Sequence, residues 1–87
     1  MSIPSEARLV IYGKPGCHLC DDARTIIDRV CTEVGTSYDE VDITTEDRLH
    51  AAYLERIPVV TLDGEERFEL FVDEAALRDL LSKVRPG

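Results

Sequence analysis

Apolar and polar residues in the first third of the chain follow the pattern of a buried strand and then an amphipathic helix. The apolar run Leu-Val-Ile-Tyr predicts a strand from Arg8 to Tyr12. After a turn that contains Gly and Pro, apolar residues recur every three or four positions, which predicts a helix from Cys17 to Val34. Gly35 suits the end of this helix because glycine readily adopts the left-handed conformation found there. The buried stripe is expected to comprise Leu19, Ala23, Ile26, Ile27, Val30, Cys31 and Val34.

A second strand and a short helix are predicted in the middle of the chain. The residues from Ser37 to Ile43 have the pattern of a strand. Thr44 or Thr45 can cap the helix that follows, because a hydroxyl can accept a hydrogen bond from a free amide of the first turn. The residues expected to face inward from this helix are Leu49, Ala52, Tyr53 and Leu54.

A hairpin and a last helix are predicted toward the C-terminus. The apolar residues from Val59 to Leu62 indicate a strand, and Asp63-Gly64 is a strong signal for a two-residue hairpin turn. The chain is expected to return as a strand from Arg67 to Phe71. Asp73 can cap the last helix. The residues of this helix that are expected to face the core are Ala76, Leu77, Leu80, Leu81 and Val84.

These elements follow one another in the order β-α-β-α-β-β-α within one domain, residues 1–87. Residues 1–6 and 85–87 are expected to be frayed termini. The first βαβ unit should be parallel and right-handed, and the closing hairpin adds an antiparallel pair. We therefore predict an α/β fold with a four-stranded mixed sheet and helices on both faces.

Charge and composition exclude several classes of partner. The net charge is −8, and the Lys and Arg residues form no cluster that could follow a phosphate backbone, so nucleic acid is not expected. The longest apolar runs have four residues, far fewer than the ~20 needed to span a bilayer, so no membrane partner is expected either. The first residues lack the basic and apolar regions of an export signal, which favours the cytoplasm. Three cysteines in such a reducing compartment favour redox or metal chemistry over structural disulfides.

The candidate chemistry lies in the run Cys17-His18-Leu19-Cys20, between the first turn and the first helix. Two thiols at this spacing can close a disulfide. A helix N-terminus favours negative charge, and CxxC contexts lower a cysteine pKa from about 8.5 to ~3.5–7.5. The combination of strand, turn, CxxC and helix therefore predicts a dithiol redox site with Cys17 and Cys20 as its reactive pair.

Over about Ala7 to Val84 the chain resembles the thioredoxin-fold superfamily, in its short glutaredoxin-like branch. Three features carry this resemblance: the segment from Lys14 to Cys20 after the first strand, the Ile57-Pro58-Val59 segment before the third, and the Asp-Gly hairpin. The resemblance implies a thioredoxin/glutaredoxin fold. It also implies a small thiol-disulfide oxidoreductase that acts in electron transport and cell redox homeostasis.

The resemblance also implies roles for individual residues. Cys17 matches the nucleophile, which attacks a substrate disulfide, and Cys20 matches the resolving thiol, which releases the reduced substrate. Pro58 matches a cis-proline beside the CxxC loop, and the backbone of Ile57 would pair with an extended thiol substrate. Lys14 matches a basic residue near the nucleophile and the glutathione carboxylate.

Two segments depart from the glutaredoxin pattern. His18-Leu19 replaces an inner pair that usually contains an aromatic residue, and we hypothesise that His18 tunes the pKa of the thiol. The segment from Glu69 to Asp73 lacks the glycine pair that opens the last helix in glutaredoxins, so only Asp73 could stand in there. Glutathione is therefore one possible partner among low-molecular-weight thiols.

The expected cycle needs no organic cofactor, because the two cysteines carry the electrons. The expected partners are a disulfide-containing protein or a small-thiol substrate, and an unidentified thiol or flavoprotein reductant. The protein is expected to be a monomer.

Two other functions stay open at this point. One is a metal-binding module in which Cys17, Cys20 and either His18 or Cys31 bind zinc, or in which Cys17 bridges an iron–sulfur cluster between chains. The other is an interaction module with idle thiols. Cys31 is expected to be a core thiol, since the helix places it roughly 16 Å beyond Cys20, too far for a disulfide.

Overall fold

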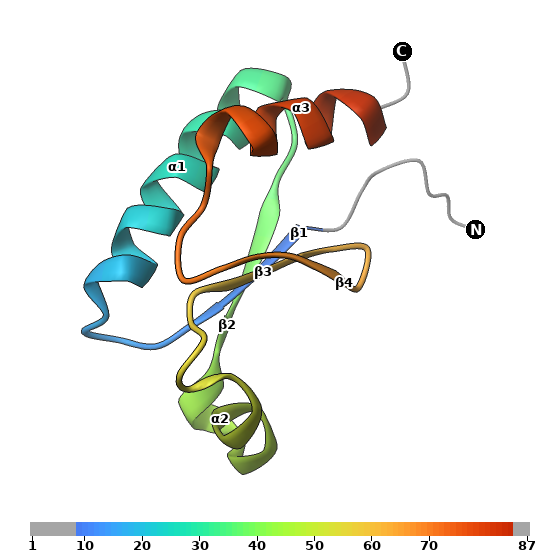
Figure 1. Ribbon diagram of the computed structural model, residues 1–87. Coiled ribbons are helices and arrows are strands. Elements are labelled where there is room, and N and C mark those ends of the chain that lie inside the picture. The colour runs from blue at the N-terminus through green and yellow to red at the C-terminus, as the bar shows by residue number, and fades with distance from the viewer. Residues whose placement is uncertain (1–8, 85–87) are drawn as a thin grey trace.

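The computed structural model describes residues 9–84, with side chains through residue 82 (Figure 1). Arg8, the expected frayed termini and the side chain of Val84 therefore lie outside the described residues. The elements are β1 (Leu9–Gly13), α1 (His18–Val34), β2 (Tyr38–Asp42), η1 (Ile43–Thr45), α2 (Asp47–Tyr53), β3 (Val59–Leu62), β4 (Glu65–Glu69) and α3 (Glu74–Val84). Apart from the added 3-10 turn η1, this is the predicted order.

The four strands form one mixed sheet in the order β2-β1-β3-β4. β1 runs parallel to β2, with Leu9 opposite Tyr38, and antiparallel to β3, with Leu9 opposite Leu62. β3 and β4 form the antiparallel hairpin, with a bulge between Val60 and Thr61. The predicted α/β class and the mixed four-stranded sheet are confirmed.

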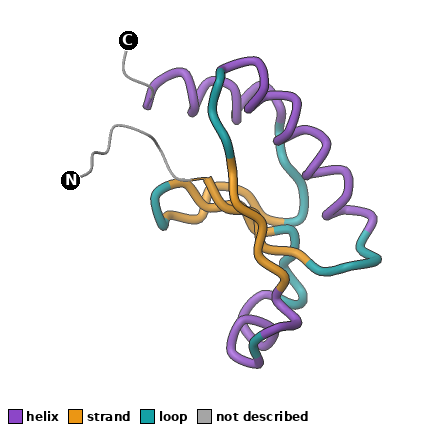
Figure 2. The backbone as a smooth tube through the Cα atoms, turned by 180° about the vertical axis from the view of Figure 1, so that it is seen from behind, coloured by secondary structure: helices purple, strands orange, loops and turns teal. Residues whose placement is uncertain are grey.

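The main core lies between one face of the sheet and the two long helices. α1 and α3 lie side by side over this face in both views (Figures 1 and 2). Complete burial of an aliphatic side chain contributes about 1.5–3 kcal/mol, so this layer supplies most of the apolar stabilisation. Cys31 is buried here, as predicted, at 3% exposure. Its fully buried companions include Ile11, Ile27, Val60, Leu77 and Leu81.

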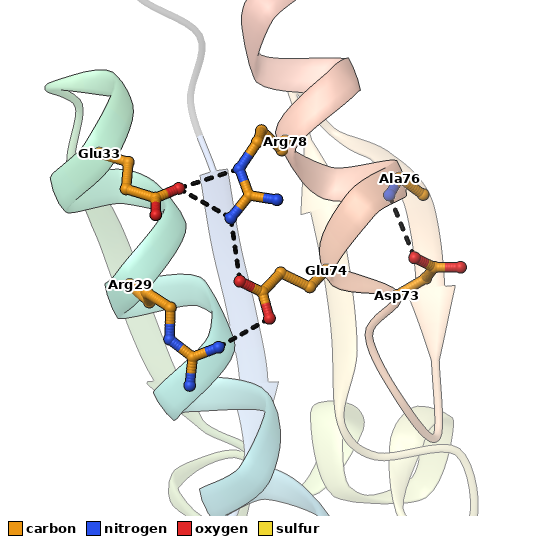
Figure 3. Close-up of polar contacts among 6 residues, drawn as sticks. All are labelled: Arg29, Glu33, Asp73, Glu74, Ala76 and Arg78. Carbon is orange, nitrogen blue, oxygen red and sulfur yellow. Dashed lines mark hydrogen bonds and ion pairs between the residues drawn. The ribbon is translucent and has the colours of Figure 1, made fainter.

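Ion pairs on the surface join α1 to α3 (Figure 3). Arg78 on α3 donates hydrogen bonds to Glu33 on α1 and to Glu74 at the start of α3. Arg29 on α1 donates to the other oxygen of Glu74 at 2.7 Å. Exposed pairs of this kind add little stability, so their main effect is to fix how the two helices are aligned.

Within residues 9–84, the opposite face of the sheet is covered by a helix only at one end, where α2 lies (Figure 1). There the rings of Tyr12 on β1 and Tyr53 on α2 pack with their centroids 5.0 Å apart. Further along this face, Val10, Tyr12, Val41 and Thr61 line an open hollow of about 640 Å³. No helix in the described part of the chain has the length and apolar character needed to cross a membrane.

The hairpin strand begins two residues earlier than predicted. Asp63 and Gly64 both have left-handed φ angles, 54° and 87°, so the turn closes after two residues and Leu62 pairs at once with Glu65. β4 therefore ends at Glu69, and the predicted strand from Arg67 to Phe71 was wrong at both ends.

The predicted cap of α2 was also wrong. The strand before it ends at Asp42, whose carboxylate accepts a hydrogen bond from the amide of Thr44 at 2.8 Å and starts the 3-10 turn. α2 can begin only after that turn, and its N-cap residue, Glu46, makes no side-chain cap hydrogen bond.

Four residues expected to face inward are exposed: Leu19, Ala52, Leu54 and Ala76. Leu19 lies in the first turn of α1, where Cys20 takes the inward position. α2 is too short to bury more than Leu49 and Tyr53, and these only partly. The stripe of α3 is centred on Leu77 and Leu81, which leaves Ala76 at its edge.

Candidate active site

Cys17 is the N-cap residue of α1 rather than its first helical residue. Its backbone is extended, with φ −101° and ψ 114°, and its carbonyl accepts the first helical hydrogen bond, from the amide of Asp21. Its sulfur is half-exposed and accepts a hydrogen bond from the backbone N–H of Cys20 at 3.2 Å. A negatively charged sulfur would accept this bond more strongly, and it would sit at the positive end of the helix dipole.

Cys20 lies one helical turn further on and is buried, with 1% of its surface exposed. Burial and the hydrogen bond with Cys17 raise the pKa of the Cys20 thiol to about 11, against the lowering effects of the Lys14 backbone and the Arg24 cation. Cys20 is therefore a protonated, shielded thiol at neutral pH. The two cysteines therefore differ in exposure, and their roles as nucleophile and resolving thiol stay predictions.

Gly13 stands directly against the buried thiol. A Cβ built on Gly13 would lie 2.9 Å from the sulfur of Cys20, closer than Cβ atoms approach any heavy atom, and 3.2 Å from the Cβ of Cys20, which is also tight. Only glycine lets the end of β1 pass this close to α1. From the sequence, Gly13 was placed in the turn after the first strand. Its position directly before the CxxC run was the signal that could have predicted this close contact.

A small apolar cluster surrounds the two thiols on their other side. Cys20, Ile43 and Ile57 form its buried part. Tyr12 and Tyr53, the pair described above, pack against it together with Cys17 and Leu49. Neither tyrosine was among the predicted site residues, because the contact depends on how α2 folds back onto β1.

The Ile57-Pro58 peptide bond is cis, as predicted, and Pro58 is fully buried. The amide of Leu70 donates to the carbonyl of Pro58 at 2.9 Å and to that of Arg56 at 3.2 Å. This segment is therefore joined to the β4–α3 loop. The side chain of Ile57 lies in the cluster with Cys20, whereas pairing of its backbone with a substrate stays a prediction.

The side chain of Arg56 fixes the same segment from outside. Its guanidinium pairs with Glu66 and Glu69 on β4 and lies over the ring of Tyr53, 5.4 Å from the centroid. Arg56 thus links the backbone before the cis-proline both to the edge strand β4 and to α2.

Lys14 and His18 lie on either side of Cys17 in the sequence. The backbone of Lys14 faces the Cys20 thiol, and Lys14 is one of the residues that line a cavity described below. His18 is the first residue of α1 and is exposed. The proposed roles of Lys14 near a carboxylate and of His18 in tuning the nucleophile stay predictions.

The β4–α3 loop presents apolar side chains beside this site. Leu70 has a left-handed φ of 74°, an uncommon conformation for a bulky residue, and its side chain is 42% exposed. Phe71 is 68% exposed, whereas Val72 is buried in the main core. Figures 1 and 2 show this loop on the side of the sheet where α1 begins.

The carboxylate of Asp73, the possible stand-in at a glutathione site, caps α3. It accepts a hydrogen bond from the amide of Ala76 at 3.1 Å, which confirms the predicted cap (Figure 3). Among the described residues, no group of three or more His, Cys, Asp and Glu side chains is arranged to hold a metal ion.

We expect alkylation to separate the three thiols by burial. Brief treatment of the reduced protein with iodoacetamide near pH 8 should add one label, at Cys17, because burial raises the pKa of both Cys20 and Cys31 to about 11. Mass spectrometry of the intact protein and its peptides measures this. In urea all three thiols should react, and equal labelling of all three in the native protein would contradict the assignment.

Comparisons with known proteins place the chain in a family and a fold. A family model for a glutaredoxin-like domain (DUF836) matches residues 8–82. A structural genomics target, XcR50 from X. campestris, is 29% identical with a TM-score of 0.69, over 86% of this chain and 96% of that one. No curated protein matches the chain in sequence.

Two further solved structures share the fold at lower identity. Protein Ne2328 from Nitrosomonas europaea is 23% identical with a TM-score of 0.75, over 93% of this chain and 98% of that one. A mutant thioredoxin from Halobacterium salinarum is 23% identical with a TM-score of 0.69, over 94% of this chain and 77% of that one. The family match spans most of the chain, and these neighbours share its fold. The chain therefore belongs to the glutaredoxin-like (DUF836) family and has a thioredoxin fold.

Proposed function

We propose that this protein is a small dithiol–disulfide oxidoreductase that reduces disulfides through Cys17 and Cys20. The observation that carries the proposal is the asymmetry of the pair. The half-exposed sulfur of Cys17 accepts the N–H of Cys20 at 3.2 Å at the start of α1, and Cys20 lies buried one turn behind it. The Cys17 sulfur is therefore placed to react with a substrate, whereas the buried Cys20 sulfur is placed to react only with Cys17.

The cycle has two exchange steps. The Cys17 thiolate attacks one sulfur of the substrate disulfide, that S–S bond breaks, and the other substrate sulfur leaves as a thiolate. Cys20 then loses its proton and attacks the sulfur of Cys17. The second substrate thiolate leaves, and a Cys17–Cys20 disulfide remains. The protein has supplied two electrons, and a small thiol or a flavoprotein reductase must restore the dithiol.

The β4–α3 loop supports a protein disulfide as the substrate. Leu70 is held through its amide, Val72 is anchored in the core, and Phe71 between them is therefore held out in solvent. The loop is joined through Leu70 to the cis-proline segment, whose Ile57 packs with Cys20, and an exposed apolar surface there is suited to the side chains that flank a cysteine in a protein. The carboxylate of Asp73 accepts a hydrogen bond from the helix amide, and the loop lacks the glycine pair found at this place in glutaredoxins.

We predict that Phe71→Ser weakens the reaction with a protein disulfide and spares the reaction with a small one. Loss of one exposed aromatic contact of about 1 kcal/mol should raise KM for the protein substrate roughly fivefold. The rate with hydroxyethyl disulfide should not change. Leu54→Ser is the matched control, because Leu54 is also an exposed apolar residue but lies at the end of α2. Equal effects of the two variants on the protein substrate would argue against a role for the loop.

The function itself is tested by steady-state reduction of a protein disulfide, with a dithiol such as dithiothreitol as the electron source. The protein should accelerate the reaction in proportion to its concentration, and a Cys17→Ser/Cys20→Ser double variant should not. If the wild-type protein is no faster than this double variant with protein or small disulfides, the proposal fails.

A further inference from the structure

The second exchange step poses a problem that the cysteines alone do not solve. Cys20 must become a thiolate before it attacks Cys17, yet it is almost completely buried. In the mixed disulfide, the hydrogen bond with the Cys17 thiol and the Cys17 charge, which both raise the pKa of Cys20, no longer exist. Burial still opposes ionisation, so a group that stabilises the Cys20 thiolate would accelerate this step.

An open cavity of about 480 Å³ lies behind the CxxC loop, on the β2 side of the sheet. Gly13 is part of its wall, and the Cys20 sulfur lies immediately against Gly13. Gly13 therefore lies next to both the cavity and the thiol. The cavity is lined by Gly13, Lys14, Pro15, Asp21, Arg24, Glu40, Val41 and Asp42.

Arg24 is fixed in the wall of this cavity. It follows Cys20 by one helical turn on α1, so both lie on neighbouring parts of the same helix face. Its Nη1 contacts a carboxylate oxygen of Asp21 at 2.8 Å. Its Nε and Nη2 both contact one oxygen of Glu40 on β2, at 2.8 and 2.6 Å. Two carboxylates thus hold one cation beside the thiol, and they also compensate much of its charge.

Lys14 also lines this cavity, but its side chain is not among the groups that shift the pKa of the Cys20 thiol. The Lys14 backbone faces the Cys20 sulfur from the β1–α1 loop, and Cys17 faces it from the start of α1. On the side away from the cavity the neighbours are apolar, with Ile43 and Ile57 buried and the two tyrosines packed around them. Among the described residues, Arg24 is the charged side chain whose cation lowers the pKa of this thiol.

We propose that Arg24 is a positioning residue for the second exchange step: its cation stabilises the Cys20 thiolate across Gly13, and Glu40 attenuates that effect. This inference rests on the proposed oxidoreductase function. In the step, the S–H bond of Cys20 breaks and its proton passes to solvent through the open cavity. The Cys20–Cys17 bond then forms as the bond from Cys17 to the substrate breaks, and the substrate sulfur takes the electron pair.

The decisive test compares Arg24→Gln with Glu40→Gln. Both substitutions break the same ion pair between α1 and β2, so a purely structural role predicts that both impair the step. Our proposal predicts opposite effects. Loss of the cation should slow the second step, and loss of the compensating carboxylate should accelerate it.

The two steps can be followed with one equivalent of dipyridyl disulfide, which is uncharged and releases one thiopyridone at each step. If the pH midpoint of Cys20 ionisation changes by one unit, the fraction of thiolate at neutral pH changes about tenfold. The nucleophilicity of that thiolate changes about threefold in the opposite direction, so the rate changes roughly threefold. We therefore expect a second phase roughly threefold slower in Arg24→Gln and up to about threefold faster in Glu40→Gln. The pH midpoint of this phase should move up in the first variant and down in the second.

Three controls separate the possible failures. The first phase, attack by Cys17, should be unchanged in both variants. Arg24→Lys keeps the positive charge, so the pH midpoint of its second phase should equal that of the wild-type protein. This measurement decides the question if Arg24→Gln does not fold. Arg78→Gln breaks the matched pairs with Glu33 and Glu74 far from the thiols and should change neither phase.

Slowing of the second phase in both Arg24→Gln and Glu40→Gln, or an unmoved midpoint in both, would overturn the role of Arg24 and leave the oxidoreductase function intact. If the wild-type protein itself shows no second phase, the proposed function fails instead.

Discussion

Replacing Cys17 with serine will abolish disulfide reduction, whereas replacing Cys20 with serine will produce a protein that stalls as a mixed disulfide with its substrate. A hydroxyl does not attack a disulfide at neutral pH, since thiolate is the nucleophile in this chemistry. We expect the turnover rate of Cys17→Ser to fall by roughly a thousandfold or more. Cys20→Ser keeps the half-exposed sulfur that carries out the first step and loses the buried one that completes the second.

The two variants are distinguished by mass as well as by rate. After reaction with a disulfide-bonded protein, Cys20→Ser should carry one covalently attached substrate chain, which a reductant removes, and Cys17→Ser should carry none. A buried serine in place of Cys20 places a hydroxyl in an apolar site, so unfolding should be measured alongside. Cys31→Ala is the control: it changes a buried thiol in the other core and should retain the activity. Full activity in Cys17→Ser would contradict the assigned roles.

Gly13→Ala will destabilise the protein and also slow the second exchange step. The new Cβ would lie 2.9 Å from the Cys20 sulfur, so the end of β1 and the first turn of α1 must move apart. Because overpacking strains the surrounding core, we expect the free energy of unfolding to fall by about 2 kcal/mol. A displacement of the thiol by even ~1 Å can slow a reaction by a factor on the order of 10², and we expect a decrease of at least about tenfold in the second phase.

Gly64→Ala provides the matched control for this prediction. A Cβ at Gly64 meets nothing within 4 Å, but its φ of 87° makes any side chain strained. The variant should therefore lose about 1–2 kcal/mol without any displacement of Cys20. Denaturant unfolding and the two-phase thiol assay compare the variants directly. If Gly13→Ala keeps the wild-type stability and second-phase rate, the close approach of β1 to Cys20 is not as described.

The parts of the site that sequence reasoning found are those with local signals. The CxxC run follows a strand and a turn, the Asp63-Gly64 pair marks a hairpin, and Asp73 precedes an amphipathic stretch as a cap should. Each of these depends on residues within a few positions of one another. The cis bond before Pro58 had no local signal in the residues themselves and was expected only through the family resemblance.

The rest of the site depends on contacts between distant segments. The pairing of Arg24 with Glu40 is set by how α1 lies along β2, which no spacing in the sequence encodes. Phe71 was expected to be the last residue of the returning strand, yet the early end of β4 leaves it in an exposed loop. A shift of two residues in one strand therefore moved this apolar residue out of the sheet and onto the surface.

The most direct test of the central claim is a redox titration of purified protein whose metal content has been measured, in defined thiol/disulfide buffers. Free thiols are trapped by alkylation and counted by mass. We expect two thiols to disappear together along a two-electron curve, peptide mapping to join Cys17 to Cys20, and Cys31 to stay reduced. If all three thiols stay reduced across the titration, or if bound metal protects them, the paired cysteines are not a redox couple and the proposed function is wrong.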